Sequence, residues 1–267
     1  MLKIKNKIKF KHSENRMKNE GDVSSSILEF KKNKNLYYLL NERYLWMNNF
    51  IKENDTGIEV GAAGGFTKSF IKCKNFKISD FSNHDHLDYK NVDAQKTGFE
   101  DKKFDFVISS NMIHHLPYPL MFFNEMHRIL KKGGKLIIFD AHCSTVLQLV
   151  LILMRHEGFD FTKNVWSDDQ PATDKEDLWS GNSAIPYLIF KDKKKFYENL
   201  GDKFEIKYEK ICECLLFLNS GGVTSKTFYI PLNSFFLKII IFLDRLLSFL
   251  FPSFFSLAYK IVLERKN

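Results

Sequence analysis

A short β-type run that ends in a cluster of small residues constrains this chain most. Residues 56–60 (TGIEV) lead directly into residues 61–65 (GAAGG). Such a turn lets a ligand approach the backbone closely, because glycine and alanine place little side chain in the way. A second β-type run ends at Asp80, 19 residues after Gly61. At this spacing an acid meets the hydroxyls of a ribose in nucleotide-binding α/β folds, so we predict a nucleoside-bearing cofactor here.

The alternation of strands and helices continues as far as residue 140. Apolar runs separated by amphipathic helical segments are typical of a parallel sheet that helices cover on both faces. A glycine pair at 133–134 ends the last of these helices. We expect strands at 56–60, 76–80, 89–93, 104–109 and 135–140, and helices at 35–52, 66–72 and 119–130.

The second half of the chain lacks this rhythm. Residues 145–200 are expected to form helices and loops, as an insert that covers the substrate. Two β-type runs, 204–218 and 223–230, surround a turn at 219–222 and predict an antiparallel hairpin at the sheet edge. The predicted fold is therefore α/β and Rossmann-like, with a mostly parallel seven-stranded sheet and an antiparallel terminal hairpin.

Three regions follow from these patterns. Residues 1–33 form a basic arm, and residues 34–232 form one domain with its cofactor half at 56–140. Residues 233–267 form an amphipathic helical tail, in which charged residues interrupt every long apolar stretch, so a transmembrane helix is not expected. On a helical wheel, Lys238, Asp244, Arg245 and Ser248 occupy about a third of the circumference. Two interpretations stay open: a helical pair packed on the domain or on a second subunit, and an interfacial helix in peripheral contact with a membrane.

Charge and cysteine content narrow the partners. The formal net charge of +8 and the pI of about 9.1 indicate solvated lysines or attraction to an anionic partner. A nucleic-acid partner is not favoured, because no aromatic-interleaved module or helix-turn-helix pattern accompanies the charge. The four cysteines are expected to be reduced thiols in a cytoplasmic protein. Contact with the inner face of the membrane is the alternative that stays open for its location.

These motifs together resemble a known family. Residues 59–65 (EVGAAGG) resemble the first motif of class I S-adenosylmethionine-dependent methyltransferases. Residues 104–117 (FDFVISSNMIHHLP) resemble the fourth-strand segment of the type-11 methyltransferase domain family, and residues 125–134 (EMHRILKKGG) continue the pattern. The resemblance covers about residues 56–140 and implies S-adenosylmethionine as the cofactor.

The resemblance also implies roles for particular residues. Glu59 supports the loop, Gly61 and Ala62 border the methionine part of the cofactor, and Asp80 holds the ribose. Asp93 and Ala94 mark the adenine region, Ser110 and Asn111 flank the amino-acid end, and Gly65 and Phe81 complete the set. Ala63 departs from the motif, since a glycine is usual there, and its methyl group narrows the approach.

Histidines after the strands are the candidates for a general base. His114 and His115 follow the fourth strand directly, and His142 follows the fifth. An imidazole titrates near neutrality and is the common base for a hydroxyl acceptor. His156 and Glu157, in the insert, are weaker candidates. The segment 84–86 (HDH) lacks a third ligand close in sequence, so no metal is expected.

The predicted reaction is methyl transfer to a small-molecule, lipid-linked or saccharide acceptor, with O-methylation favoured. A dehydrogenase is disfavoured, because Ala63 and Phe66 stand where its Gly-x-Gly-x-x-Gly fingerprint needs glycines. Two alternatives remain open: a non-catalytic scaffold or regulatory subunit that keeps the fold, and an RNA methyltransferase suggested only by charge.

Overall fold

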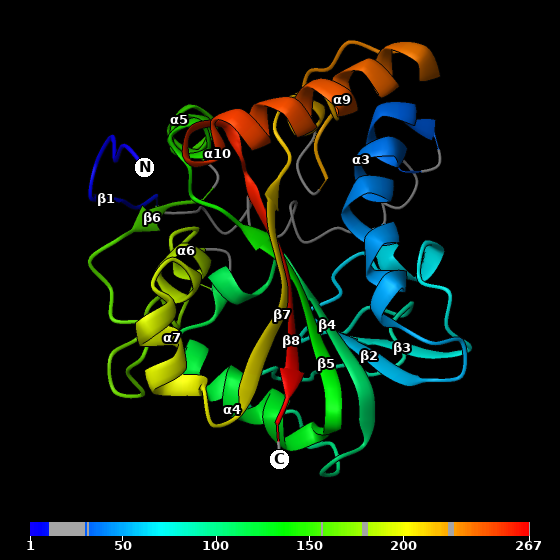
Figure 1. Ribbon diagram of the computed structural model, residues 1–267, viewed down its shortest axis with the longest axis vertical. Coiled ribbons are helices and arrows are strands. Elements are labelled where there is room, and N and C mark those ends of the chain that lie inside the picture. Colours follow the sequence, from blue (N-terminus) through cyan, green and yellow to red (C-terminus); the bar gives the residue numbers. More distant parts are fainter. Residues whose placement is uncertain (11–29, 31, 156, 178–180, 224–226, 267) are drawn as a thin grey trace.

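The computed structural model describes residues 1–10, 30, 32–155, 157–177, 181–223 and 227–266. Its centre is a six-stranded sheet in the order β3-β2-β4-β5-β8-β7 (Figure 1). The strands are β2 (Thr56–Val60), β3 (Asn75–Ser79), β4 (Phe104–Ser110), β5 (Leu130–Ala141), β7 (Phe204–Cys212) and β8 (Ala258–Arg265). This mixed, mostly parallel sheet confirms the α/β fold class.

The first four strands of the sheet are parallel, as predicted. β2 pairs with β3 on one side and with β4 on the other, and β4 pairs with β5. All four strands therefore end at the same edge, where ligands bind in open α/β sheets. The short 3-10 helices η2 (Phe66–Ser69) and η3 (Ile113–His115) begin at this edge.

Alternate residues of the strands supply two hydrophobic cores, one on each face. Val107, Leu136 and Ile138 pack beneath α4 (Pro119–Ile129), α6 (Ile185–Phe190) and α7 (Lys193–Leu200). Phe106, Ile137 and Phe139 point the other way, toward α3 (Lys34–Tyr44). This period of two is the reason that the strands read as continuous apolar runs in the sequence. The helix expected at 35–52 ends earlier, because its last turns form the 3-10 helix η1 (Leu45–Phe50).

Two strand predictions were wrong. Residues 89–93 form no strand: Tyr89 makes one isolated bridge to Ser79 and Asp93 makes another to Lys96, and Asn91 between them has a φ of 56°. The sheet of the described residues thus has six strands, not seven. The antiparallel pair exists, but β7 pairs with β8. Of the second predicted run, residues 223 and 227–230 form no strand, and residues 224–226 lie outside the described part of the chain. β8 lies between β5 and β7 and is antiparallel to both. The tail at 233–267 is therefore not wholly helical, since its last part is a central strand.

The insert and the arm meet beside the sheet. α5 (Thr145–Met154) begins the insert, and its Thr145 hydroxyl donates to the carbonyl of Leu2. β1 (Lys7–Ile8) pairs with β6 (Phe159–Asp160), so residues 7–8 are not the irregular arm that the sequence suggested. Residues 11–29 of the arm lie outside the described part of the chain. In Figure 1 the chain begins beside α5.

Between β7 and β8 the chain forms α8 (Leu215–Leu218), α9 (Ser234–Leu250) and α10 (Pro252–Phe255). α9 lies across one end of the molecule, and α10 packs against both α9 and α5 (Figure 1). Asp244 and Ser248 of α9 face inward and are buried. The Asp244 carboxylate accepts hydrogen bonds from the backbone N–H groups of Leu215 and Leu216.

The outer face of α9 is apolar, which reverses the usual arrangement of a surface helix. Lys238 and Arg245 of α9 are exposed. Its exposed apolar residues are Phe235, Phe236, Ile239, Phe242, Leu243, Leu246, Phe249 and Leu250. We call these eight residues, with Phe251 and Phe254 beyond them and Leu149, Leu153 and Met154 of α5, the apolar surface. Among the helices of the described residues, none has the length and apolar character needed to cross a bilayer.

Candidate functional site

The turn after β2 has the backbone shape of a ligand-binding loop. Gly61 and Gly65 have φ angles of 73° and 64°. A Cβ at Gly61 would lie 2.2 Å from the Cγ of Met112, so only glycine fits there. Ala63 also has a positive φ, 43°, a conformation that costs an alanine more than a glycine. The turn thus keeps the glycine geometry even at the position where this chain has alanine and the motif has glycine.

Asp80 is fixed at the edge of this turn. One carboxylate oxygen accepts from the N–H of Ala63 at 2.8 Å, and the other accepts from the N–H of Ser82 at 2.8 Å. A carboxylate has about four lone-pair sites, so roughly two remain for a ligand. Phe81, next in the chain, is 57% exposed and offers a flat ring beside the carboxylate. This combination suits a ribose and its base.

Asp93 and Ala94 lie on the next connection along this edge. The Asp93 carboxylate accepts from the N–H of Gln95 at 2.8 Å, and Ala94 is buried. The Gln95 side chain in turn accepts from the N–H of Tyr118. This small polar turn therefore connects the Asp93 loop to the segment before α4.

Glu59 lies inside the loop rather than on its surface. Its carboxyl group accepts a short hydrogen bond from the Thr67 hydroxyl and so ties β2 to η2. Burial raises the pKa of Glu59 to about 8, and the nearby Asp80 charge adds to the rise against the opposing Thr67 contact. The group is thus mostly neutral at pH 7. Ala62, also nearly buried, donates its N–H to the carbonyl of Ser79.

Ser110 and Asn111 follow β4 at the same edge. Ser110 is buried, and Asn111 has a φ of 51° with its N–H donating to the Phe139 carbonyl at 2.7 Å. The Asn111 side chain lines a cavity of about 350 Å³. The predicted amino-acid end of the cofactor therefore opens directly into a second space.

That cavity is mostly apolar with one polar end. Its apolar wall comes from α5, the α8 region and the start of β8: Leu147, Val150, Leu151, Met154, Phe217, Leu218, Val223, Leu257 and Ala258. His114, His115 and Glu157 form the polar end, and Arg43 with Glu213 adds an ion pair to the wall. A cavity of this size and character suits a small organic ligand.

His114 sits between two carboxylates. Its Nδ1 lies 2.5 Å from Oδ1 of Asp140, and its Nε2 lies 3.3 Å from Oε2 of Glu157. Burial disfavours the charged ring, but Asp140 and Glu157 outweigh burial and raise the pKa of His114 to about 10. Asp140 also accepts from the N–H groups of Met112 and Ile113, which fixes η3 against the end of β5.

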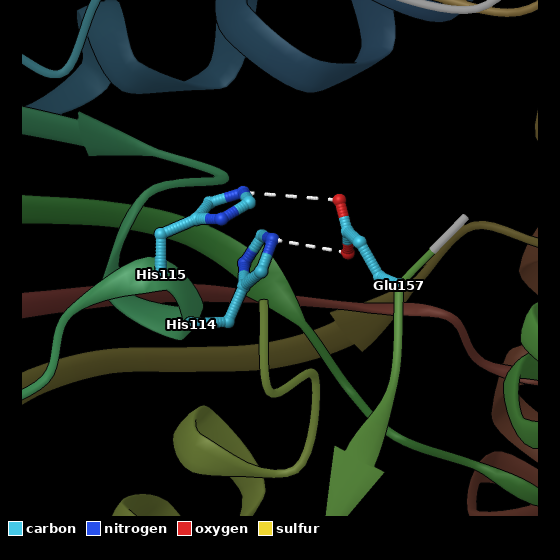
Figure 2. A group of neighbouring side chains, drawn as sticks. All are labelled: His114, His115 and Glu157. Carbon is cyan, nitrogen blue, oxygen red and sulfur yellow. Dashed lines mark ion pairs between the residues drawn. The ribbon is translucent and has the colours of Figure 1, made fainter. Parts of the chain in front are cut away.

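His115 lies on the cavity side of the same short helix. Its Nε2 is 3.7 Å from Oε1 of Glu157, and its side chain is 25% exposed. Figure 2 shows both imidazole rings directed toward the Glu157 carboxylate. Gly181 lies against them: a Cβ there would be 3.0 Å from Cδ2 of His114 and 3.2 Å from Cε1 of His115. The structure thus brings two predicted histidines together with one acid of the insert.

His142 is placed elsewhere. Its Nδ1 donates to the carbonyl of Ser256 at 2.9 Å, and its ring packs edge-on against Tyr259. Burial lowers its pKa. It is not among the described residues that line the cavity, so its position fits packing between β5 and the start of β8. His156 lies outside the described residues.

Sequence reasoning gave no role to two features of this site. Asp140 was noted only as the end of a strand, although an acid at a strand end was the signal that identified Asp80. Arg43 is buried and forms a two-pronged ion pair with Glu213, at 2.6 and 2.8 Å. Arg43 follows the apolar Leu40 by three residues and so lies on the same face of α3. This spacing could have predicted that Arg43 faces inward.

Comparison with known proteins agrees with this geometry. A family model described as a methyltransferase domain, type 11, matches residues 66–138. A highly reducing polyketide synthase of Calcarisporium arbuscula is 30% identical over 106 residues, 38% of this chain and 4% of that protein. A second, from Leptosphaeria maculans, is 32% identical over 89 residues, 31% of this chain and 3% of that protein. The chain thus spans only a few per cent of the length of these relatives.

The fold has a solved counterpart. The crystal structure of an S-adenosylmethionine-dependent methyltransferase from Archaeoglobus fulgidus superposes with a TM-score of 0.54. The match covers 89% of this chain and 98% of that one, at 13% identity. At this identity the likeness shows the fold.

The residues present fit the family's cofactor. The turn at Gly61 has the glycine-only backbone of a ligand-binding loop, and the half-satisfied Asp80 carboxylate keeps lone pairs for the hydroxyls of an adenosyl group. Asp93 and Asn111 lie on the following connections of the same edge. The matched family model, the fold and this loop agree, and the chain therefore carries a class I S-adenosylmethionine-dependent methyltransferase domain.

Proposed function

We propose that this chain methylates a hydroxyl oxygen on an acceptor with an apolar chain, such as a lipid or a lipid-linked saccharide, at a membrane surface. The observation that carries the proposal is the position of the cavity. It begins at Asn111 beside the cofactor loop, and its wall includes Met154 and Leu218. These two side chains are 39% and 42% exposed, so the cavity wall reaches the outside next to the apolar surface.

The polar end of the cavity suits a hydroxyl acceptor. Bound S-adenosylmethionine supplies a methyl group on a positively charged sulfur, which leaves as a neutral thioether. The acceptor oxygen forms the new bond to carbon and loses its proton. His115 and Glu157 face the cavity, and we assign proton acceptance to this pair. His114 is held by both Asp140 and Glu157, so its role is to position the pair.

The apolar surface supports the membrane part of the proposal. Phe242 and Phe249 of α9 are 64% and 80% exposed, whereas the polar Asp244 is turned inward. A helix in this orientation can bury its phenylalanines only in something outside its own domain. The basic residues Lys3 and Lys5 are exposed on the segment that rests on α5, near one end of this surface. Anionic headgroups beside an apolar interior match this combination.

A polyketide-type acyl chain is a second acceptor class. The two relatives above are described as polyketide synthases, and the apolar cavity wall admits an acyl chain as readily as a lipid tail. The position of the new methyl group separates the two, because a lipid hydroxyl gives a methoxy group and a polyketide carbon gives a branched chain. Mass-spectrometric fragmentation of the product distinguishes them.

The direct test is transfer of labelled methyl groups to fractionated cell extract. We expect label in the lipid fraction with the wild type. Asp80→Ala should bind the cofactor roughly 100-fold more weakly, because it loses two hydrogen bonds to a charged group. Asp85→Ala is the matched control, since Asp85 lies on the same connection and pairs with Lys90 in solvent.

Each other outcome would point elsewhere. Equal labelling by the wild type and Asp80→Ala would contradict the site. Label confined to RNA would identify an RNA methyltransferase, and cofactor binding without transfer to any fraction would identify a scaffold or regulatory subunit.

A further inference from the structure

We infer that His114, His115 and Glu157 form a binding site for one divalent transition-metal ion at the polar end of the cavity. Among the described residues, these three form the one group of histidine, cysteine and acid side chains whose ligand atoms all lie within 4.8 Å of one another. Two come from η3 and the third from the insert, so three ligands converge from two segments (Figure 2). The inference rests on these contacts and not on the methyl acceptor.

The spacing fits an ion better than direct hydrogen bonds. Glu157 lies 3.3 Å from Nε2 of His114 and 3.7 Å from Nε2 of His115. Charge-assisted hydrogen bonds between nitrogen and a carboxylate are shorter, about 2.7–2.9 Å. Ligands at about 2.0–2.2 Å from a tetrahedral ion lie roughly 3.3–3.6 Å from one another. The 3.3 Å distance, to Oε2 of Glu157, falls in this range, and the 3.7 Å distance, to Oε1, lies just above it. All three ligand atoms lie within 4.8 Å of one another, so small side-chain shifts would bring them around one ion.

The surroundings of His114 prepare its Nε2 as a ligand. Asp140 holds Nδ1 at 2.5 Å, so that nitrogen carries a proton and Nε2 faces Glu157. A carboxylate behind a ligating imidazole is the usual way in which proteins orient a metal-bound histidine. Ser183 contacts Oε2 of Glu157 at 3.2 Å. The two carboxylates around one ring require a positive charge between them, and a proton or a metal ion supplies it.

The ligand set selects the kind of ion. Two imidazoles and one carboxylate favour zinc, iron(II), cobalt(II) and similar ions over magnesium and calcium, which prefer oxygen ligands. Three protein ligands leave at least one coordination position open, and here it faces the cavity. A hydroxyl bound at that position would become more acidic, as water does on zinc. With an ion bound, His115 and Glu157 would act as ligands in place of the proton acceptance assigned to them above, and the acidified hydroxyl would lose its proton to water in the cavity.

Metal binding is measured on the purified full chain without cofactor or acceptor and without an affinity tag. Equilibrium dialysis against cobalt(II) or zinc, followed by elemental analysis, should give one bound ion per chain. Cobalt(II) should add visible absorption bands of a low-symmetry site, without the thiolate charge-transfer band that cysteine ligands produce. Glu157→Gln and His115→Gln should each weaken binding at least 10-fold.

The control is the second histidine pair. His84 and His86 stack at 5.6 Å between their ring centroids on the connection after β3, and the double variant His84→Gln/His86→Gln should keep the ion. Thermal unfolding of each variant confirms that it is folded. A wild type that retains no ion, or an ion lost only from the His84 and His86 variant, would overturn the inference. Failure of methyl transfer with metal binding intact would instead count against the proposed function.

Discussion

The cofactor half and the outer helices of this molecule follow opposite rules. From β2 to β5, apolar side chains fill the two cores, and the acids Asp80 and Asp93 lie at the edge where the strands end. In α9 the acid Asp244 is buried against α8, and the phenylalanines face outward. In the first region, burial within the chain accounts for the positions of the apolar residues. In α9 it does not, because the largest apolar side chains are the exposed ones.

In α9, the residues that attach the helix to the domain are therefore different from those that are available to contact another surface. Leu237, Ile240 and Ile241 pack α9 against the core, and Asp244 binds it to α8. The exposed phenylalanines of α9 are not part of this core, and their presence points to a surface that covers them.

The largest expected effect is on the buried ion pair that links α3 to the segment after β7. Arg43 of α3 and Glu213, which follows β7, form a buried ion pair. Arg43→Met should destabilise the protein by about 3–5 kcal/mol in urea unfolding, because Glu213 is left charged and buried. Adding Glu213→Gln should recover part of the loss. Arg245→Met is the matched control, since its pair with Glu42 is exposed and should contribute under about 1 kcal/mol. If Arg43→Met and Arg245→Met destabilised the protein equally, the buried pair would contribute no more than the exposed one, and the prediction would be wrong.

The outer surface is tested by Phe242→Ala/Phe249→Ala. Two phenylalanines that enter a bilayer contribute about 3 kcal/mol together, so partitioning onto anionic vesicles should fall roughly 100-fold. The unfolding midpoint should hardly change, because neither ring is buried in the chain. Tyr197→Ala, on α7, is the control for a half-exposed ring elsewhere. Unchanged partitioning, with a dimer that dissociates in the variant, would assign the surface to a second copy.

The buried acid of α9 predicts a pH dependence. Burial raises the pKa of Asp244 to about 6, against the opposing backbone hydrogen bonds of Leu216 and Leu215. Since the folded pKa lies above the unfolded value of 3.8, the folded state binds the proton more tightly. This contribution to stability is full below about pH 4 and is lost as the pH rises through about 6, by about 3 kcal/mol in all. Asp244→Asn should remove that slope, and a slope equal to that of the wild type would contradict the assignment.

The smallest effect is in the cofactor loop. Ala63→Gly should stabilise the protein by at most about 1 kcal/mol, because glycine adopts the positive φ of this position without steric cost. The gain is partly offset by the larger entropy of glycine in the unfolded chain. Chemical unfolding measures the change, and Ala62→Gly, at a position without a positive φ, should destabilise instead.

Prediction from the sequence succeeded where the signals are local. Residues 104–109 and 119–130 were placed within one residue of β4 and α4, because a buried parallel strand and an amphipathic helix are each marked by adjacent residues. The glycine pair at 133–134 does not end α4 as predicted, since the helix ends at Ile129 and both glycines lie within β5. The same is true of the turn at Gly61, where backbone geometry and composition coincide. The strand at 89–93 was wrong, because a single left-handed residue, Asn91, was enough to end its pairing.

Prediction failed where distant segments decide the outcome. The apolar run at 254–262 suits a helix or a strand equally, and only its pairing with β5 and β7 makes residues 258–265 a strand. The wheel of α9 showed a polar and an apolar side but not which of them faces the domain. His114, Asp140 and Glu157 lie on three separate segments that come together only in the fold. No spacing in the sequence could therefore predict the cluster.

The position of β8 has a consequence for how the protein is made. Residues 142–257, including α9, are synthesised after β5 and before the strand that pairs with it. A nascent chain on the ribosome therefore carries an unpaired β5 edge and an apolar helix at the same time, both of which favour aggregation. Truncation before residue 258 would open the middle of the sheet rather than trim a tail. Translation must continue to residue 265 before the fold can close.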